Sequence, residues 1–377
     1  NPARVSMPDI DIDISDIKRD KVINYVKEKY GLDKVGNIIT FSTLLPKQVL
    51  RDVGKVLDIS TNKLDQFINL LNDNESLEVL ESKNKYKDLV KFNKEYIKLL
   101  EISKVLEGLK KHPSIHAAGI VIDSESLINK VPLFKSGDNI IVGYDKHYIE
   151  DLGILKIDLL SIRNLSIIEE ILEEIKRETN EKINLNNIPL DDKKTLELFR
   201  KGDTTGIFQY ESAGMRNLIK KINVNSFEDL VVSIAMFRPG PIKMIPTFLK
   251  RKSGQEKIVY PAKELEPILK ETLGIMVYQE QLLEILKVMG GYSYSEADII
   301  RAAIKSKDES ILINEKSIFK QKSKKLGYNE VTIDNVYNMI MKFANYGFNK
   351  SHSVAYAFVA YQMGYLKANY PHPGKEY

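Results

Sequence analysis

The sequence predicts an α+β protein whose sheet is interrupted by a helical insertion and followed by a mostly helical second half. Three observations support this fold class. Residues 7–14 alternate acidic and apolar side chains, as strands do, whereas residues 58–110 are rich in Lys, Glu and Leu and nearly free of Gly and Pro. Short β-branched stretches return between residues 120 and 160, and from about residue 190 the periodicity is mostly helical.

The composition is that of an ordinary globular protein, with 377 residues, 43% of them hydrophobic and 29% charged. This length predicts two or three subdomains. The sequence has no run of about 18 apolar residues and no charged-then-apolar leader, so we expect neither a membrane span nor a secretion signal. Cysteine is absent, which excludes disulfides, thiolate zinc sites and a cysteine nucleophile in this sequence and fits a cytoplasmic location.

The net charge of +4 is unevenly distributed along the chain. Residues 201–377 hold 25 Lys and Arg against 18 Asp and Glu, whereas the first 200 residues have a small acidic excess. The basic second half is compatible with a nucleic-acid surface.

The stretch of residues 7–14 carries acids at alternate positions, namely Asp9, Asp11 and Asp13. In an extended strand these acids share one face, and the isoleucines between them share the other. Carboxylates about 7 Å apart repel one another unless a cation lies between them, and a hard divalent cation prefers oxygen ligands. The stretch therefore predicts a metal site. The alternative is an exposed edge strand whose acids face water.

The first half then alternates helices and strands in order. Residues 16–30 have helical spacing and end at Gly31, residues 35–42 suggest a short strand or buried turn, and helical spacing resumes at 47–57. Residues 58–110 predict a small helical subdomain.

The sheet is expected to resume after this insertion. A strand begins at residues 120–122, short strands follow within 130–145, and residues 154–160 form an apolar strand carrying Asp158, followed by a helix to about 179. His112 and His116 have the i, i+4 spacing of helical zinc ligands, but Pro113 disrupts the helix that such a site requires, so no zinc site is expected.

In the second half, residues 238–241 and 290–291 mark loops. Ser293 and Glu296 form a capping box that opens a helix carrying Arg301, and Ser351 is expected to cap a long final helix that ends at Pro371.

Several segments, in this order along the chain, together resemble the catalytic core of the alpha subunit of bacterial DNA polymerase III, the C family of DNA polymerases. The resemblance is carried by NPARVSMPDIDID (1–13), IITFSTLLPKQVLRDVGKV (38–56), HAAGIVI (116–122), LKIDLLSIRN (155–164), GIFQYESAGM (206–215), RPGPI (238–242), GIMVYQEQ (274–281) and YGFNKSHSVAYAFVAYQMGYLKANYP (346–371). The segments HAAG and FNKSHS are more similar to the form of this subunit that lacks a built-in proofreading exonuclease.

The resemblance implies a palm like that of polymerase-beta-type nucleotidyltransferases, with an inserted helical thumb and mostly helical fingers. Carried onto this sequence, the palm spans residues 1–32 and 111–185, the thumb 33–110 and the fingers 186–377.

The resemblance also implies template-directed DNA synthesis, in which two Mg²⁺ ions support transfer of a deoxynucleotide from a dNTP to a primer 3′-hydroxyl. Asp11, Asp13 and Asp158 match the family's catalytic metal ligands, which leaves Asp9 a supporting role. Lys156 shares a strand face with Asp158 and is expected near phosphate, or, alternatively, in a surface salt bridge.

Further nucleotide-binding residues are expected in the second half. Arg301 and Lys350 belong to segments that contact the incoming nucleotide in the family, and His352 matches the position that senses the sugar. Each has a simpler alternative: a solvated cation for Arg301 and Lys350, a cap or core residue for His352.

Basic residues are expected to contact the phosphates of the primer-template DNA, without reading its sequence. The candidates are Lys47, Arg51, Lys250, Arg251, Lys252, Lys320, Lys322, Lys324 and Lys325. The sliding clamp and other replisome subunits are expected to bind regions outside this sequence, and no membrane partner is expected.

This sequence does not include the Gly-Ser motif that, in the family, precedes the acidic strand and cradles the triphosphate. We therefore expect a fragment of a longer polypeptide. Two competing functions remain open: a catalytically incomplete remnant or DNA-binding module that keeps the fold, and a nucleotidyltransferase that acts without template.

Overall fold

The computed structural model describes residues 8, 10–72, 75–137, 139–306, 309–343 and 347–371, with side chains for all of these except 147, 304–306 and 309–313. It is a mixed α+β protein, as predicted, with one mixed sheet and many helices. The chain divides into two compact units at the junction between Ile162 and Arg163. Within the described part of the chain, no helix is both long and apolar enough to cross a membrane.

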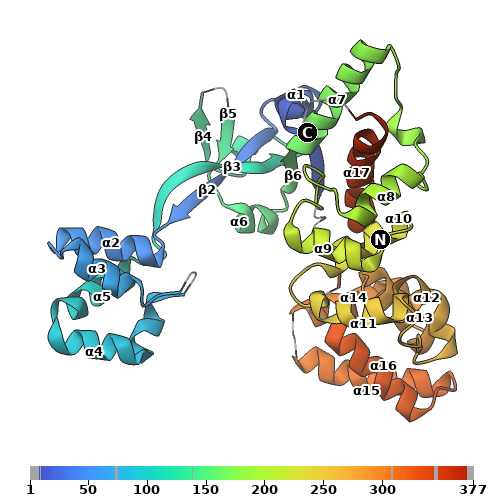
Figure 1. Ribbon diagram of the computed structural model, residues 1–377. Coiled ribbons are helices and arrows are strands. Elements are labelled where there is room, and N and C mark those ends of the chain that lie inside the picture. The colour runs from blue at the N-terminus through green and yellow to red at the C-terminus, as the bar shows by residue number, and fades with distance from the viewer. Residues whose placement is uncertain are drawn as a thin grey trace. The chain divides into compact units, whose positions relative to one another are not determined.

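The first unit is built on a six-stranded sheet with the order β1-β6-β3-β2-β5-β4 (Figure 1). β1 pairs in parallel with β6, whereas β3 runs antiparallel to both β6 and β2. The strands are β1 (Asp11–Ser15), β2 (Val35–Thr43), β3 (Lys110–Ile122), β4 (Leu133–Ser136), β5 (Asn139–Val142) and β6 (Leu155–Ile162). The parallel pairing joins segments nearly 150 residues apart in the sequence, and it brings the two predicted acidic strands side by side.

Each face of the sheet has its own small core. On one face, Ile23 of helix α1 (Arg19–Tyr30) packs with Ile120 and Leu159. On the other, Ile38 and Val121 pack with residues that include Ile149 of helix α6 (Lys146–Asp151). Neighbouring residues on a strand point to opposite faces, so β3 contributes Ile120 to one core and Val121 to the other.

A separate helical group lies between β2 and β3 in the sequence and, as Figure 1 shows, at the far end of the ribbon that these two strands form. It comprises α2 (Pro46–Val56), α3 (Thr61–Ile68), α4 (Asn84–Phe92), α5 (Glu95–Leu106) and a short 3-10 helix, Leu77–Ser82. Its core is centred on Phe67, whose ring stacks on that of Tyr96 with 4.8 Å between centroids. The group is smaller than the range 33–110 expected for a thumb, because Val35–Thr43 pairs with β3 and β5 and is part of the sheet.

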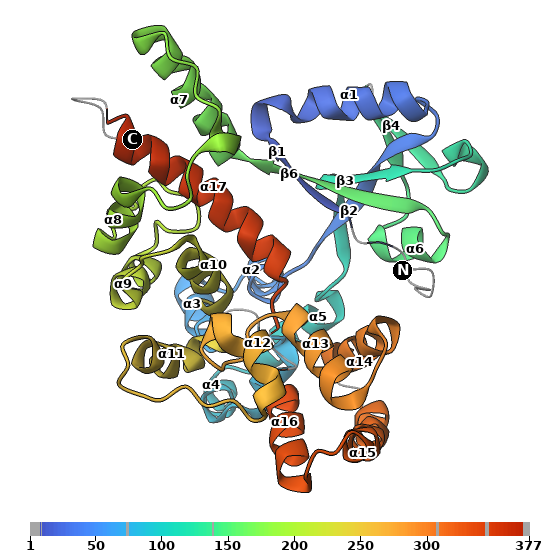
Figure 2. The ribbon, with the colours of Figure 1, turned by 90° about the vertical axis from the view of Figure 1, so that its right-hand side faces the viewer.

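The second unit is helical and has two cores. The first core gathers around Phe199, Tyr210 and Tyr361. Its helices are α7 (Arg163–Thr179), α8 (Lys193–Lys201), α9 (Ala213–Ile222), α10 (Phe227–Met236) and the long α17 (Lys350–Asn369), which crosses α8 and α10 in Figure 2. Helix α7 thus belongs to the helical unit, although the expected palm extends to residue 185.

The second core of this unit gathers around Leu286, Phe319 and Ile340. The helices of this part of the chain are α11 (Ile245–Lys252), α12 (Glu266–Leu269), α13 (Gln279–Gly290), α14 (Tyr294–Ser306), α15 (Glu309–Lys325) and α16 (Glu330–Phe343). The capping box predicted for α14 is confirmed: Glu296 N donates to Ser293 Oγ, and Ser293 N donates to the Glu296 carboxylate.

An extended segment, residues 275–278, is shared between the two cores of the helical unit. Ile275, Val277 and Tyr278 are buried in the first core, whereas Met276 is buried in the second. Phe348 N donates to Val277 O at 3.2 Å, and Gln279 N donates to Phe348 O at 2.8 Å. This short bridge connects the segment to the residues that lead into α17.

Candidate active site

The sheet brings two of the predicted metal ligands together. Asp11 on β1 and Asp158 on β6 are direct register partners, and Asp158 N donates to Ile10 O at 2.9 Å. Side chains at paired positions of neighbouring strands share a face, so these two carboxylates are neighbours. Asp13 pairs with Leu160, one pleat further along β1, and Asp9 lies outside the described residues.

The two oxygens of Asp158 have different surroundings. Oδ2 lies 2.8 Å from Lys156 Nζ, in a pair whose side chains are only 16% and 15% exposed. Oδ1 is buried and has no hydrogen-bond donor among the described residues. A buried carboxylate oxygen without a partner is energetically costly, and a bound cation is one way to compensate it.

The described residues do not by themselves form a complete metal centre. Asp11 and Asp13 are exposed, and the described residues contain no group of three or more acidic or histidine side chains placed to hold one ion. The residues that fit a divalent cation are Asp158, with its partnerless oxygen, and its neighbour Asp11.

The expected apolar face of β1 is only partly buried. Ile14 packs against the core around Ile23, but Ile12 is 45% exposed. The apolar face of β1 is therefore covered at Ile14 and largely open at Ile12.

Sequence reasoning missed a bulge beside Asp158. Gly119 on β3 is the register partner of Asp158, and the preceding residues of β3 leave the regular ladder with β2. His116 Nδ1 accepts hydrogen bonds from Gly119 N at 2.6 Å and from Ala118 N at 3.2 Å. The signal in the sequence is the segment HAAG, which belongs to the family resemblance and whose His116 is not expected to bind zinc.

In the helical unit, the predicted phosphate-binding cations have acidic partners. Arg301 Nε donates to Asp298 at 2.8 Å, and Lys350 Nζ lies 2.6 Å from the Glu271 carboxylate. The backbone N–H of Lys350, at the first turn of α17, donates to Glu280. Both cations are partly exposed, so their partners can be exchanged for a ligand.

His352 is not the cap of α17, and neither is Ser351. The N-cap is Asn349, whose Oδ1 accepts from His352 N at 3.0 Å, so the helix begins two residues earlier than expected. The His352 ring instead lies between two aromatic rings. Its centroid is 4.0 Å from that of Tyr356 and 5.4 Å from that of Phe348.

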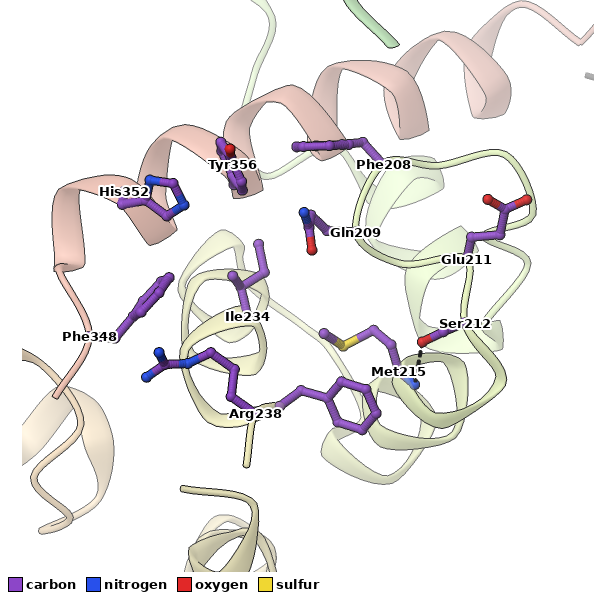
Figure 3. Close-up of a pocket in the computed structure, with 11 residues that line it drawn as sticks. Phe208, Gln209, Glu211, Ser212, Met215, Ile234, Arg238, Phe348, His352 and Tyr356 are labelled. Atoms are coloured by element: carbon purple, nitrogen blue, oxygen red, sulfur yellow. Dashed lines mark hydrogen bonds between the residues drawn. The ribbon is translucent and has the colours of Figure 1, made fainter. Parts of the chain in front are cut away.

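This aromatic group forms one wall of a cavity of about 480 Å³ in the helical unit (Figure 3). A cavity of this size can hold a small ligand. Its lining comes from α9, α10, α17 and the adjoining loops: Phe208, Gln209, Glu211, Ser212, Met215, Ile234, Phe237, Arg238, Phe348, His352 and Tyr356.

Arg238 is the cation of this cavity. Its guanidinium carbon lies 4.1 Å from the centroid of the Phe348 ring, and Nε donates to Ala235 O at 3.2 Å. Burial lowers the pKa of Arg238 by removing its charge from water. Figure 3 shows Gln209 across the cavity from Arg238, and Gln209 has the left-handed φ of +65° that is uncommon outside glycine. Gln209 and Arg238 both lie in segments that carry the family resemblance, but nothing in the sequence indicates that they line the same cavity.

Most of the predicted DNA-contacting cations form ion pairs within the protein. On α15, Lys320 and Lys324 pair with Glu330, and Lys322 lies 3.6 Å from Glu296 and over the Tyr292 ring. Arg251 Nε donates to Glu256, and Lys252 pairs with Asp229. These five cations are expected to contact DNA phosphates, and each has an acidic partner within the protein.

The remaining candidates are more accessible. Arg51 on α2, Lys250 on α11 and Lys325 on α15 are exposed and form no ion pair with a described residue. Lys47, one helical turn before Arg51, is partly buried.

Neighbouring carboxylates on adjacent strands of a sheet are an arrangement that can hold a divalent cation in an enzyme. Comparison with known proteins is more specific. The family model for the bacterial DNA polymerase III alpha NTPase domain matches residues 1–161, and the one for the finger domain of the same subunit matches residues 164–327. The chain belongs to the bacterial DNA polymerase III alpha subunit family.

Curated relatives agree along nearly the whole chain. DNA polymerase III subunit alpha of Bacillus subtilis (strain 168) is 46% identical over 375 residues, which is 98% of this chain and 34% of the relative. The proteins of the same name from Staphylococcus epidermidis (strain ATCC 12228) and Staphylococcus aureus (strain MRSA252) are each 42% identical and cover 99% and 98% of the chain. The chain spans about a third of the length of these relatives.

Proposed function

We propose that this chain is the catalytic core of a DNA-directed DNA polymerase, which adds deoxynucleotides to a primer 3′-hydroxyl under the direction of a template. The sheet of the first unit serves as a polymerase-beta-like palm, the helical group α2–α5 as a thumb, and the second unit as fingers. The relatives' name and the family models support this assignment.

One observation carries the proposal: Asp11 and Asp158 are register partners on parallel strands, and Asp158 has a buried oxygen with no donor in the described part of the chain. Asp11, Asp13 and Asp158 would hold magnesium. When bound, two Mg²⁺ ions supply charge stabilisation for the attacking hydroxyl and the leaving pyrophosphate. Lys156 neutralises the other oxygen of Asp158 and lies where it can meet a phosphate.

The helical unit supplies the nucleotide contacts. Arg301 and Lys350 would exchange Asp298 and Glu271 for triphosphate oxygens, since charge-assisted bonds to phosphate are at least as strong as partly exposed ion pairs. His352, which lies between Phe348 and Tyr356, would contact the sugar of the nucleotide and exclude one with a 2′-hydroxyl. Arg238 and Gln209 extend this set into the cavity.

Primer-template DNA would be held through backbone phosphates. Lys47 and Arg51 on the thumb, with Lys250 and Lys325 on the fingers, are the cations best placed for such contacts. Sliding clamp and other replisome subunits would bind through parts of the longer polypeptide. A replicative role of this kind places the protein in the cytoplasm.

Primer extension by the full-length polypeptide tests the proposal. Asp11→Ala and Asp158→Ala should each lower the rate by ~10³-fold or more, because each removes a ligand of the metal site. Asp20→Ala, an exposed acid on α1, is the matched control and should retain full activity. Rates within a few-fold of wild type for the first two variants would contradict the metal assignment.

The same assay separates the remaining possibilities. If Asp9→Ala abolishes extension while Asp13→Ala does not, the ligand set includes Asp9 in place of Asp13. Absence of incorporation by the wild type would favour a non-catalytic DNA-binding module, and tailing without template would favour a template-independent transferase.

A further inference from the structure

The bulge beside Asp158 is a second structural feature of the proposed metal site. Asn37 and Ile39 of β2 pair with Ile120 and Ile115 of β3, so that a single β2 residue, Ile38, lies opposite four β3 residues, 116–119. Bulges of this kind re-aim the chain and are common beside active sites. Here the bulge ends at Gly119, the residue paired with Asp158.

The side chain of His116 closes the bulge. An interrupted ladder leaves backbone N–H groups without strand partners, and buried N–H groups need an acceptor. His116 Nδ1 accepts from two of them, Ala118 N and Gly119 N. An atom that accepts two N–H bonds carries no hydrogen of its own, so the ring's hydrogen is on Nε2.

Gly119 is held where no side chain fits. A Cβ at this position would lie 2.8 Å from Ile38 Cδ1, 2.9 Å from His116 Nδ1 and 3.2 Å from Asp158 Oδ1. The φ angle of Gly119 is not in the left-handed region, so glycine is required here by space rather than by backbone conformation. The His116 imidazole and the buried Asp158 Oδ1 thus both lie beside Gly119.

We propose that His116 is a positioning residue of the metal site: it closes the bulge that holds Gly119 against Asp158, and thereby keeps Asp158 Oδ1 buried, without a protein donor and available to a divalent cation. The inference rests on the proposed polymerase function. Without the His116 acceptor, the freed N–H of Gly119 becomes a competing donor beside that oxygen, and the bulge loses its closure.

The experiment measures Mn²⁺ binding to the full-length polypeptide by the loss of the free-ion electron paramagnetic resonance signal. His116→Leu should weaken Asp158-dependent binding by about tenfold, as expected for partners one shell away from a metal. Asp158→Ala defines which binding belongs to this site. His112→Leu, on the same strand with an exposed side chain, is the matched control and should bind as wild type.

Two further variants separate positioning from mere folding. Asn Oδ1 occupies nearly the same place as His Nδ1 and readily accepts the N–H two residues on, so His116→Asn should bind Mn²⁺ within about threefold of wild type. His116→Gln places its oxygen one bond further out and should not restore binding. In primer extension, His116→Leu should lower kcat and leave the KM for dNTP within about twofold.

Wild-type affinity for Mn²⁺ in His116→Leu, or equal rescue by Gln and Asn, would overturn the inference while the polymerase assignment stands. If the wild type shows no Asp158-dependent Mn²⁺ binding and no primer extension, the proposed function fails and the inference fails with it. Should His116→Leu not fold, the comparison of the Asn and Gln variants decides the question alone.

Discussion

In the sequence, the acids of β1 and β6 and the lysines of α15 both look functional. In the structure, these two groups differ in whether the protein supplies partners for their charged atoms. Lys320, Lys322 and Lys324 on α15 each have an acidic partner supplied by another helix. On β6, Asp158 has one oxygen paired with Lys156 and one buried oxygen without a donor among the described residues. A charge cluster that the protein neutralises by itself serves the fold, whereas a buried carboxylate oxygen left without a donor indicates a ligand.

The sharpest test of this contrast compares single charge removals in the two regions. Asp158→Asn keeps the shape of the side chain but removes its charge, so primer extension by the full-length polypeptide should fall by ~10³-fold or more. Lys320→Gln should change the same rate by less than about twofold. Comparable losses in the two variants would remove the distinction.

The next largest effect is expected from crowding the acidic site without touching its charge. Gly119→Ala inserts a methyl group against His116 and Asp158, which should destabilise the protein by about 1–3 kcal/mol and lower kcat by about tenfold or more. Thermal unfolding and single-turnover extension measure the two effects. Gly137→Ala is a turn control: nothing lies within 4 Å of the added atom, but its φ of +59° disfavours alanine, so this variant should lose stability and keep a normal kcat. A Gly119→Ala enzyme with normal kcat would mean that the bulge tolerates the methyl group.

A smaller effect is expected in the aromatic cavity, where Arg238 is a partly buried cation over the Phe348 ring. Arg238→Gln should raise the KM for dNTP by about tenfold, since a hydrogen bond between charged groups contributes about 1.5–3 kcal/mol. Arg216→Gln is the comparison, because Arg216 donates to Gly202 O and does not line the cavity. Steady-state kinetics with each variant measure the change. If only kcat falls and KM is unchanged, Arg238 does not bind the nucleotide.

The smallest effect is expected from the basic residues. Arg51→Gln, which removes a cation with no described acidic partner, should weaken primer-template binding and reduce the slope of log K against log salt by about 1. Lys324→Gln removes a cation paired with Glu330 and should leave that slope unchanged. Fluorescence anisotropy over a salt series measures both variants. Equal slopes for Arg51→Gln and wild type would exclude a phosphate contact at Arg51.

Sequence reasoning succeeded where structure is set by local pattern. The alternation in β1, the apolar run of β6, the capping box of α14 and the helical insertion are all local signals, and each element is present. The start of α17 is two residues earlier than expected because Asn349 and Ser351 are both good caps, and tertiary context decides between them.

The site was harder to foresee because its properties depend on residues far apart in the sequence. The pairing of Asp11 with Asp158 spans the whole helical insertion, and the partner of Lys320 lies on the next helix. Whether a charge is buried, paired or left without a partner is decided by these contacts. From residue type alone, Asp158 and Lys320 are therefore equally good candidates for functional residues.

The extended segment 275–278 has a consequence for how the helical unit comes apart. Its side chains are shared between two hydrophobic cores, so neither core can lose its packing without withdrawing residues from the other. The amides of Gln279 and Phe348, which join this segment to the start of α17, then become exposed only in the global opening of the unit. In hydrogen exchange they should be among its most protected amides, and the two cores should melt in a single cooperative transition.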